Sequence, residues 1–152
     1  QLPVPMVCVA QRLRDAGVVA FSRGDAGLAV QASSAIEGQL TPVRILGERY
    51  ADADLRMPLP VRLTRALGAV RVLAVDASAH EDRAPAGAER WRESDRRKRA
   101  LTRPDAEAAD VLLHPDFGYW VNLSREFRER AIDAGYRAAL AAAPQLRSLH
   151  AD

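Results

Sequence analysis

Short apolar runs separated by turn-forming residues characterise the first part of the chain. Residues 6–10 (MVCVA) form a continuous apolar run of strand length, the pattern of a strand that is covered on both faces. Residues 18–21 (VVAF) form a second run, and Asp15-Ala16-Gly17 between them is turn chemistry. The pattern therefore predicts a β-hairpin over residues 5–22.

A second hairpin is predicted around Gly47. Residues 43–46 and 49–51 have strand character and flank Gly47-Glu48, where glycine at the first turn position suits a type II′ turn. Asp52 and Asp54 follow this hairpin, one residue apart. By spacing alone, Asp52 is either a solvated turn residue or an acid held at the end of a strand, where α/β sheets build their sites.

Three further segments have helical patterns. Residues 28–36 are alanine-rich and apolar nearly all round, which predicts a short buried helix. Two more helices have recognisable ends, because they start near Pro60 and Ser124 and stop near Gly68 and Pro144.

The order of the remaining elements indicates the fold class. Residues 70–76 (VRVLAVD) are the most strand-like segment of the chain, and residues 109–113 predict another strand that ends at His114-Pro115. A helix followed by an apolar strand is half of a βαβ unit. We therefore expect an α/β fold, part of a three-layer α/β/α sandwich with a central, mostly parallel sheet and hairpin additions.

Composition excludes several classes of protein. The 48% hydrophobic and 28% charged residues are typical of a globular chain, and 152 residues is the size of one ordinary domain. A net charge of +2 is too balanced for nucleic-acid binding by the whole domain. The single cysteine, Cys8, cannot form an internal disulfide. No apolar run approaches the roughly 20 residues that span a bilayer, and no signal-peptide pattern occurs, so a cytoplasmic location is expected.

Residues 89–99 concentrate charge around Trp91, with six Arg or Lys and three acids. Such runs are usually solvated helices or loops with mixed i,i+4 pairs. Two binding alternatives stay open, stacking of Trp91 on a nucleic acid and contact of Trp91 and the basic residues with anionic lipid headgroups. Of these we expect no nucleic acid and retain peripheral membrane contact.

No cofactor or metal motif is recognisable. The three histidines have no His-x-x-x-His spacing and are expected to be ordinary polar residues: His80, His114 and His150. A magnesium site of Asp52, Asp54 and Asp76 is chemically acceptable, but nothing in the sequence brings them together. Gly-rich phosphate loops and Gly-x-Ser-x-Gly are both absent from the sequence. We expect neither a cofactor nor a metal.

A series of short motifs runs through the chain in a fixed order. Its members are Cys8-Val9-Ala10, Phe21-x-x-Gly24-Asp25, Ala32-Ser33-Ser34-Ala35-Ile36-x-Gly38, Pro42-Val43, Tyr50-x-Asp52, Pro58-x-Pro60-Val61, Ala66-Leu67-Gly68-Ala69, Ala74-Val75-Asp76, Ala109-Asp110-Val111, Pro115-Asp116 and Ala131-Ile132-x-Ala134-Gly135-Tyr136. The series resembles the C-terminal half of bacterial patatin-like phospholipases. The resemblance implies that residues 1–152 are the C-terminal portion of one patatin-like domain, whose N-terminal portion lies outside this sequence.

The same resemblance implies hydrolysis of lipid acyl esters by a Ser–Asp dyad. In that family the serine of Gly-x-Ser-x-Gly attacks the ester carbonyl, and the aspartate of an Asp-Gly-Gly or Asp-Gly-Ala motif is the general base. Asp52 occupies the position of that aspartate. Because the family's nucleophile and oxyanion loop lie N-terminal to the resembling region, this chain alone is expected to be inactive, and its implied partners are the missing N-terminal half and a lipid ester.

The surroundings of Asp52 depart from the family pattern. Ala53 and Asp54 stand where glycines normally follow the acid. If the first of these positions has a positive φ, Ala53 is strained by about 1 kcal/mol or more. Ser33 and Ser34 fall in a predicted helix, where their hydroxyls are expected to bond to helix carbonyls. These departures leave open an alternative function, a catalytically inactive patatin-like domain that binds lipid or a protein partner.

Overall fold

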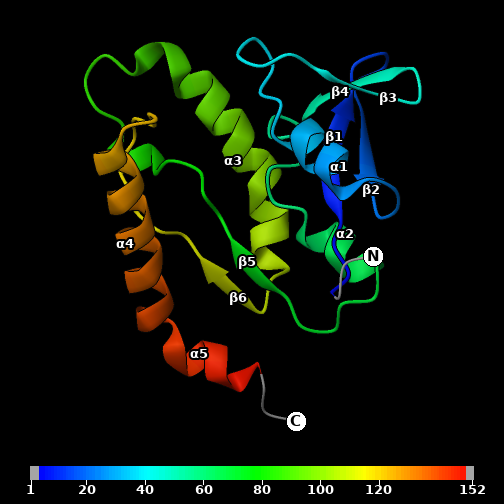
Figure 1. Ribbon diagram of the computed structural model, residues 1–152. Coiled ribbons are helices and arrows are strands. Elements are labelled where there is room, and N and C mark those ends of the chain that lie inside the picture. The colour runs from blue at the N-terminus through cyan, green and yellow to red at the C-terminus, as the bar shows by residue number, and fades with distance from the viewer. Residues whose placement is uncertain (1–3, 150–152) are drawn as a thin grey trace. The chain divides into compact units, whose positions relative to one another are not determined.

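A computed structural model describes residues 4–149 of the chain (Figure 1). Helices and strands are both present, so the predicted α/β class is confirmed. The chain divides into two compact units, one up to Pro58 and one from Leu59 onwards, and each is described separately below. A three-layer patatin-like sandwich stays a prediction.

The first unit is a four-stranded antiparallel sheet with one helix against it. The strand order is β2–β1–β4–β3, formed by β1 (Cys8–Arg12), β2 (Gly17–Phe21), β3 (Val43–Ile45) and β4 (Glu48–Asp52). Helix α1 (Ala26–Ser33) packs against β1 and β4. The core of this unit is built from Ala10, Ala32 and Tyr50, with the ring of Phe21 edge-on to Tyr50 at 5.0 Å between centroids.

The predicted hairpin over residues 5–22 is confirmed as the antiparallel pair β1–β2. Arg12 pairs with Gly17 at its end, and the intervening turn is held by Asp15, whose carboxylate accepts the Gly17 N–H at 3.0 Å. The hydrogen bond from the Arg12 guanidinium and the bond from Gly17 lower the pKa of Asp15 to about 2. The predicted turn at Asp15-Ala16-Gly17 is therefore present, and the Asp15 side chain stabilises it.

The second hairpin is present, but the predicted type II′ turn at residues 47–48 is wrong. Ile45 pairs with Glu48, which leaves Leu46 and Gly47 as the two loop residues. Both have positive φ, 49° and 84°, as a type I′ turn requires. Type I′ matches the right-handed twist of the flanking strands, so the register of the pairing decided the turn rather than the position of the glycine.

Helix α1 begins two residues earlier than predicted and is buried on one face only. The Asp25 carboxylate caps it by accepting the Leu28 N–H at 3.0 Å. Ala29 and Ala32 are its buried residues, whereas the apolar Leu28 and Val30 are exposed. The expected burial on all sides is therefore wrong, since a single sheet covers a single face of this helix.

The second unit contains a parallel βαβ unit. Strands β5 (Leu73–Val75) and β6 (Val111–Leu113) are parallel. The connection between them holds the short 3-10 helices η1 (Glu81–Arg83) and η2 (Glu89–Trp91) and the helix α3 (Arg92–Glu107). The charged run of residues 89–99 therefore opens the crossover helix, which is buried only at Thr102 and Asp105.

Helix α2 (Val61–Ala66) also belongs to the second unit, where it contacts α3, and it has well-defined ends. At its start, the buried carboxylate of Asp105 accepts the Arg62 N–H at 2.7 Å. At its end, Gly68 has a φ of 102° and donates its N–H to Arg65, while Ala69 donates to Thr64. This is the Schellman arrangement, which confirms Gly68 as the residue that stops the helix.

The C-terminal helices are α4 (Arg125–Ala141) and α5 (Ala143–Ser148). Ser124 is the N-cap of α4, as predicted, and its hydroxyl accepts the Phe127 N–H at 3.1 Å. The expectation that Pro144 ends this helix is wrong: α4 ends at Ala141 and Pro144 lies in the first turn of α5, where a missing N–H is harmless. Across residues 4–149, no helix is long and apolar enough to cross a membrane.

The Leu46–Gly47 turn leads to a stability prediction. Leu46 is fully exposed and holds a left-handed conformation that disfavours a residue with a branched side chain. We expect Leu46→Asn to raise the free energy of unfolding by about 0.5–1 kcal/mol, because asparagine tolerates this conformation and no packing is lost. Urea denaturation measures the change, and an unchanged or lower midpoint contradicts the turn geometry.

Candidate functional site

Asp52, the candidate base, is the last residue of β4. It pairs with Ala10 across the β1–β4 ladder, and its N–H donates to the Ala35 carbonyl oxygen at 2.9 Å. Its neighbours Ala51 and Ala53 are 0% and 3% exposed, while Asp52 itself is partly exposed. The backbone of Asp52 is therefore fixed on both sides, and the residue stands at a strand end as predicted.

The Asp52 side chain is held by the backbone that follows it. The Asp54 N–H donates to Asp52 Oδ1 at 2.7 Å, which forms a tight local turn and orients the carboxylate. Among residues 4–149, positive φ in non-glycine residues occurs only at Ala16 and Leu46. Ala53 is therefore free of the left-handed strain that was expected if the family's glycine conformation were retained.

Ser34, which lies near this strand end, is bonded to helix α1. Ser34 Oγ donates to the Val30 carbonyl oxygen at 2.9 Å, which confirms the predicted bond from this hydroxyl to the helix. The Ser34 N–H also donates to the helix, at its C-terminal end. The Ser34 hydroxyl is therefore engaged by its own helix.

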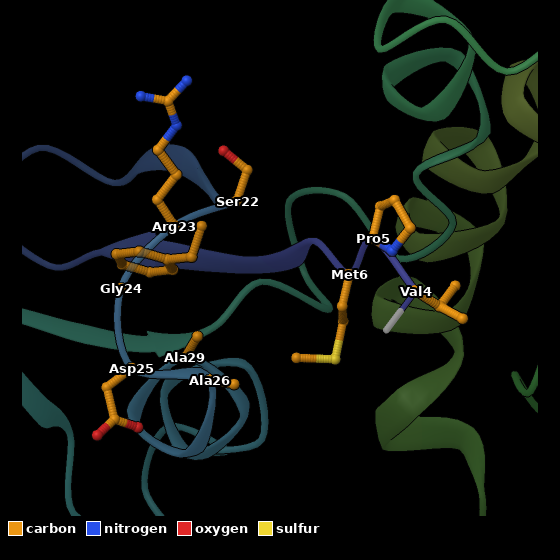
Figure 2. Close-up of a pocket in the computed structure, with 10 residues that line it drawn as sticks. Val4, Pro5, Met6, Ser22, Arg23, Gly24, Asp25, Ala26 and Ala29 are labelled. Atoms are coloured by element: carbon orange, nitrogen blue, oxygen red, sulfur yellow. The ribbon is translucent and has the colours of Figure 1, made fainter. Parts of the chain in front are cut away.

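A cleft of about 880 Å³ opens in the same unit (Figure 2). It is lined by residues 4–6 before β1, residues 21–25 after β2, and Ala26 and Ala29 of α1. Figure 2 shows the side chains of Arg23 and Asp25 leaving the loop in opposite directions. Asp52 is not one of its lining residues, and the Asp25 carboxylate at its edge caps α1.

A second polar cluster lies at the carboxyl ends of β5 and β6, and sequence reasoning missed it. Asp76, only 4% exposed, accepts the Ser78 N–H at 2.9 Å and an Arg99 N–H at 3.1 Å. His114 Nε2 is 2.9 Å from the Ser78 carbonyl oxygen, so that nitrogen carries the proton. The His80 ring stacks on His114 with centroids 3.8 Å apart.

The electrostatics of this cluster favour a charged Asp76. Burial acts to raise the pKa of its carboxyl group, but the hydrogen bonds from the Ser78 hydroxyl and N–H and the charges of His114 and Arg99 lower it, and the net pKa is below its usual range. Because the Ser78 hydroxyl bonds to the carboxylate rather than to an imidazole, the cluster is not a Ser–His–Asp triad. It fixes the ends of two parallel strands.

The histidines are closer in the fold than in the sequence. His80 and His114 belong to the cluster just described, and His80 Nε2 is buried with no hydrogen-bond partner within the described part of the chain. His150 lies outside the described residues. The residues from 4 to 149 contain no group of three side chains arranged to hold a metal ion.

The chain is similar to part of three mycobacterial proteins, each named as an uncharacterized NTE family protein. One is from Mycobacterium bovis and two are from strains of Mycobacterium tuberculosis, and each is 35% identical over 81 residues. The match covers 53% of this chain and spans only 22% of the length of these relatives. No protein-family model matches the chain. Since NTE is a patatin-like phospholipase family, the relatives support a patatin-like link at this coarse level.

The buried Asp76 predicts a dependence of stability on pH. Because its pKa in the folded state is lowered, its stabilising contribution is complete above the unfolded pKa of about 4 and is lost as the pH falls through the folded value. We expect Asp76→Asn to lower the free energy of unfolding at pH 7 by about 1–3 kcal/mol and to flatten the acid limb of its pH profile.

A matched variant separates this effect from a general loss of charge. Asp116 forms an exposed pair with Arg83 at 3.5 Å, so Asp116→Asn should change stability by about 0.5 kcal/mol or less and keep the wild-type acid limb. Urea denaturation between pH 3 and pH 7 measures both variants. An acid limb for Asp76→Asn as steep as that of the wild type contradicts the assignment.

Proposed function

We propose that this chain is the C-terminal portion of a patatin-like serine acyl hydrolase that acts on lipid acyl esters. Asp52 is its general base, and the nucleophilic serine belongs to an N-terminal segment outside these 152 residues. The observation that carries the proposal is the oriented Asp52 carboxylate at the end of β4, which accepts the Asp54 N–H, while the Asp52 backbone N–H donates to the Ala35 carbonyl oxygen. The NTE family names of the mycobacterial relatives support the hydrolase class.

The proposed chemistry needs one proton acceptor. As the serine oxygen attacks the ester carbonyl, its proton moves to the Asp52 carboxylate, and the same proton is then given to the departing alcohol. In the second half-reaction a water oxygen attacks the acyl-serine carbonyl while Asp52 takes its proton. Asp52 then returns this proton to the serine oxygen as the acyl–serine bond breaks and the fatty acid leaves. A carboxylate can act without histidine when its position is fixed, and the Asp54 N–H bond to Oδ1 supplies that orientation here.

Exposed apolar faces in the second unit support the proposal that more of the domain lies outside this sequence. Leu73 and Val75 of β5 and Leu112 of β6 are 45%, 53% and 41% exposed. Parallel strands are normally covered on both faces, whereas here Leu73 and Val75 lie on one face and Leu112 on the other, so both faces are partly open. On α4, Ile132, Tyr136 and Leu140 form an exposed apolar stripe of i, i+4, i+8 spacing. A further layer of the same domain is the covering that we propose.

A second candidate function, an inactive patatin-like domain that binds lipid or a protein, is favoured by one specific observation. The first residues after Asp52 are Ala53 and Asp54 in place of glycines, and Asp52 Oδ1 is engaged by the backbone of Asp54. A serine must therefore approach the carboxylate beside an additional acidic side chain. The two candidates differ in whether the upstream segment contains Gly-x-Ser-x-Gly.

The proposed role of Asp52 predicts a large loss of activity on its removal. In the polypeptide that contains this chain together with its serine-bearing segment, Asp52→Asn should lower kcat for a chromogenic acyl ester by about 10²–10⁴-fold. The asparagine amide retains an oxygen that can accept the Asp54 N–H, so the fold should persist by circular dichroism. The isolated 152 residues should hydrolyse no ester.

Asp54→Asn is the matched control. It removes a charge of the same sign two residues away and keeps the N–H that orients Asp52, so kcat should stay within a few-fold of the wild type. Equal losses in the two variants would point to the charge of the segment rather than to a base. Hydrolysis that survives Asp52→Asn sinks the assignment and leaves the binding domain as the better description.

A further inference from the structure

An aromatic cluster joins two segments of the second unit. Trp91 in η2 meets Trp120 in the loop between β6 and α4 edge to face, with ring centroids 5.0 Å apart. Trp120 meets Tyr119 in the same geometry at the same separation. In Figure 1 the loop that leads into α4 lies beside the start of α3. Folding therefore brings two aromatic residues of the loop before α4, Tyr119 and Trp120, next to the basic run of residues 89–99.

The loop beyond this cluster presents apolar side chains to solvent. Trp120, Val121 and Leu123 are 47%, 69% and 89% exposed. Isolated exposed apolar residues are ordinary, but here three lie within four positions of one loop, beside a second tryptophan. We name Trp91, Trp120, Val121 and Leu123 the aromatic-loop patch.

Arginines with uncharged partners surround this patch. The Arg90 guanidinium lies 3.7 Å from the centroid of the Trp91 ring, and Arg128 donates to the Leu123 carbonyl oxygen at 3.1 Å. Arg130 donates to the Phe117 carbonyl oxygen at 3.0 Å. Rings and carbonyls leave the positive charge uncancelled. Residues 89–99 and 116–130 together contain nine Arg or Lys and six acids, so the two segments that carry the patch have a net positive charge.

The loop is anchored in this position by a hydrogen bond to α3. The Tyr119 hydroxyl donates to an Asp95 carboxylate oxygen, and this bond raises the pKa of Tyr119 to about 12. The phenol therefore stays protonated and keeps its bond at physiological pH. A loop held in this way loses little conformational freedom when its tip enters another phase.

We propose that the aromatic-loop patch docks onto the surface of an anionic phospholipid bilayer. Tryptophan rings prefer the headgroup region, Val121 and Leu123 reach toward the acyl chains, and the neighbouring arginines face the phosphates. The charge of the surroundings is complementary to an anionic leaflet. This surface lies in the second unit and its binding requires no hydrolysis, so it goes beyond the proposed reaction of Asp52.

A bilayer fits this surface better than a nucleic acid does. Stacking on bases needs an open aromatic face, whereas the Arg90 guanidinium covers a face of Trp91, and Trp120 makes edge-to-face contacts with both Trp91 and Tyr119. The exposed aliphatic side chains of Val121 and Leu123 also have no partner on a phosphate backbone. Both features are accounted for by an interface that is apolar on one side and anionic on the other.

The test uses the intrinsic fluorescence of the 152-residue protein. Trp91 and Trp120 are its only tryptophans, so the emission reports on this patch alone. With vesicles of phosphatidylcholine and phosphatidylglycerol in a 3:1 ratio, about as in an anionic leaflet, the emission should shift to the blue and the protein should co-sediment. Leu123→Asp should lower the vesicle partition coefficient by about tenfold or more.

Leu46→Asp is the matched control. Leu46 is fully exposed in the first unit, its backbone conformation suits aspartate, and the substitution changes the net charge by the same amount. This variant should partition like the wild type, and circular dichroism should show both variants folded. Pure phosphatidylcholine vesicles should bind more weakly, and added salt should weaken binding to the anionic vesicles.

Three results overturn the proposal. The first is no co-sedimentation and no spectral shift with the anionic vesicles. The second is an equal loss of binding in Leu123→Asp and Leu46→Asp, which assigns any binding to net charge. The third is retardation of a single-stranded oligonucleotide, abolished by Arg90→Gln, in a protein that ignores vesicles, which assigns the patch to nucleic acid.

Discussion

The antiparallel pairing of β1 with β4 is the contact on which the first unit depends. It joins two hairpins into one sheet and sets Ala10 opposite Asp52. Ala10, Ala32 and Ala51 are 0% exposed, and these small side chains let α1 approach the sheet closely. The position of Asp52 is a consequence of this register, because a slip by one residue would exchange the two faces of β4 and turn the acid to the opposite side.

In the second unit, buried carboxylates specify how the elements meet. Asp105 joins α3 to the start of α2 through Arg62, and Asp76 joins the end of β5 to α3 through Arg99. The apolar core beside them is small, made of Leu59, Val61, Val72 and Ala74. Small apolar side chains can pack together in several ways, whereas a buried carboxylate is stable only beside specific hydrogen-bond donors. The ion pairs therefore define the arrangement of these elements more than the apolar core does.

The two proposed functional features are chemically compatible. An acyl hydrolase for lipid esters works on molecules that are held in a bilayer, so a surface with affinity for headgroups brings such a protein to its substrate. The proposed role of Asp52 rests on one oriented carboxylate at a strand end. The proposed role of the aromatic-loop patch rests on exposed apolar side chains of an anchored loop. The first depends on exact geometry and the second on surface chemistry.

The sequence by itself determined the features that depend on neighbouring residues. The Asp15-Ala16-Gly17 turn of the first hairpin, the Ser124 cap and the Gly68 stop all follow from local chemistry, and each was predicted. These features could be read because their hydrogen bonds connect residues only a few positions apart.

Only the tertiary structure decided what depends on distant residues. Strand register moved the second turn to Leu46–Gly47, and the packing of α1 on one sheet exposed Leu28 and Val30. The stacking of His80 on His114 and the meeting of Trp91 with Trp120 bring together segments that no local pattern connects. Turn signals and periodicity report on a few neighbouring residues, whereas these contacts exist only after the strands and helices have packed.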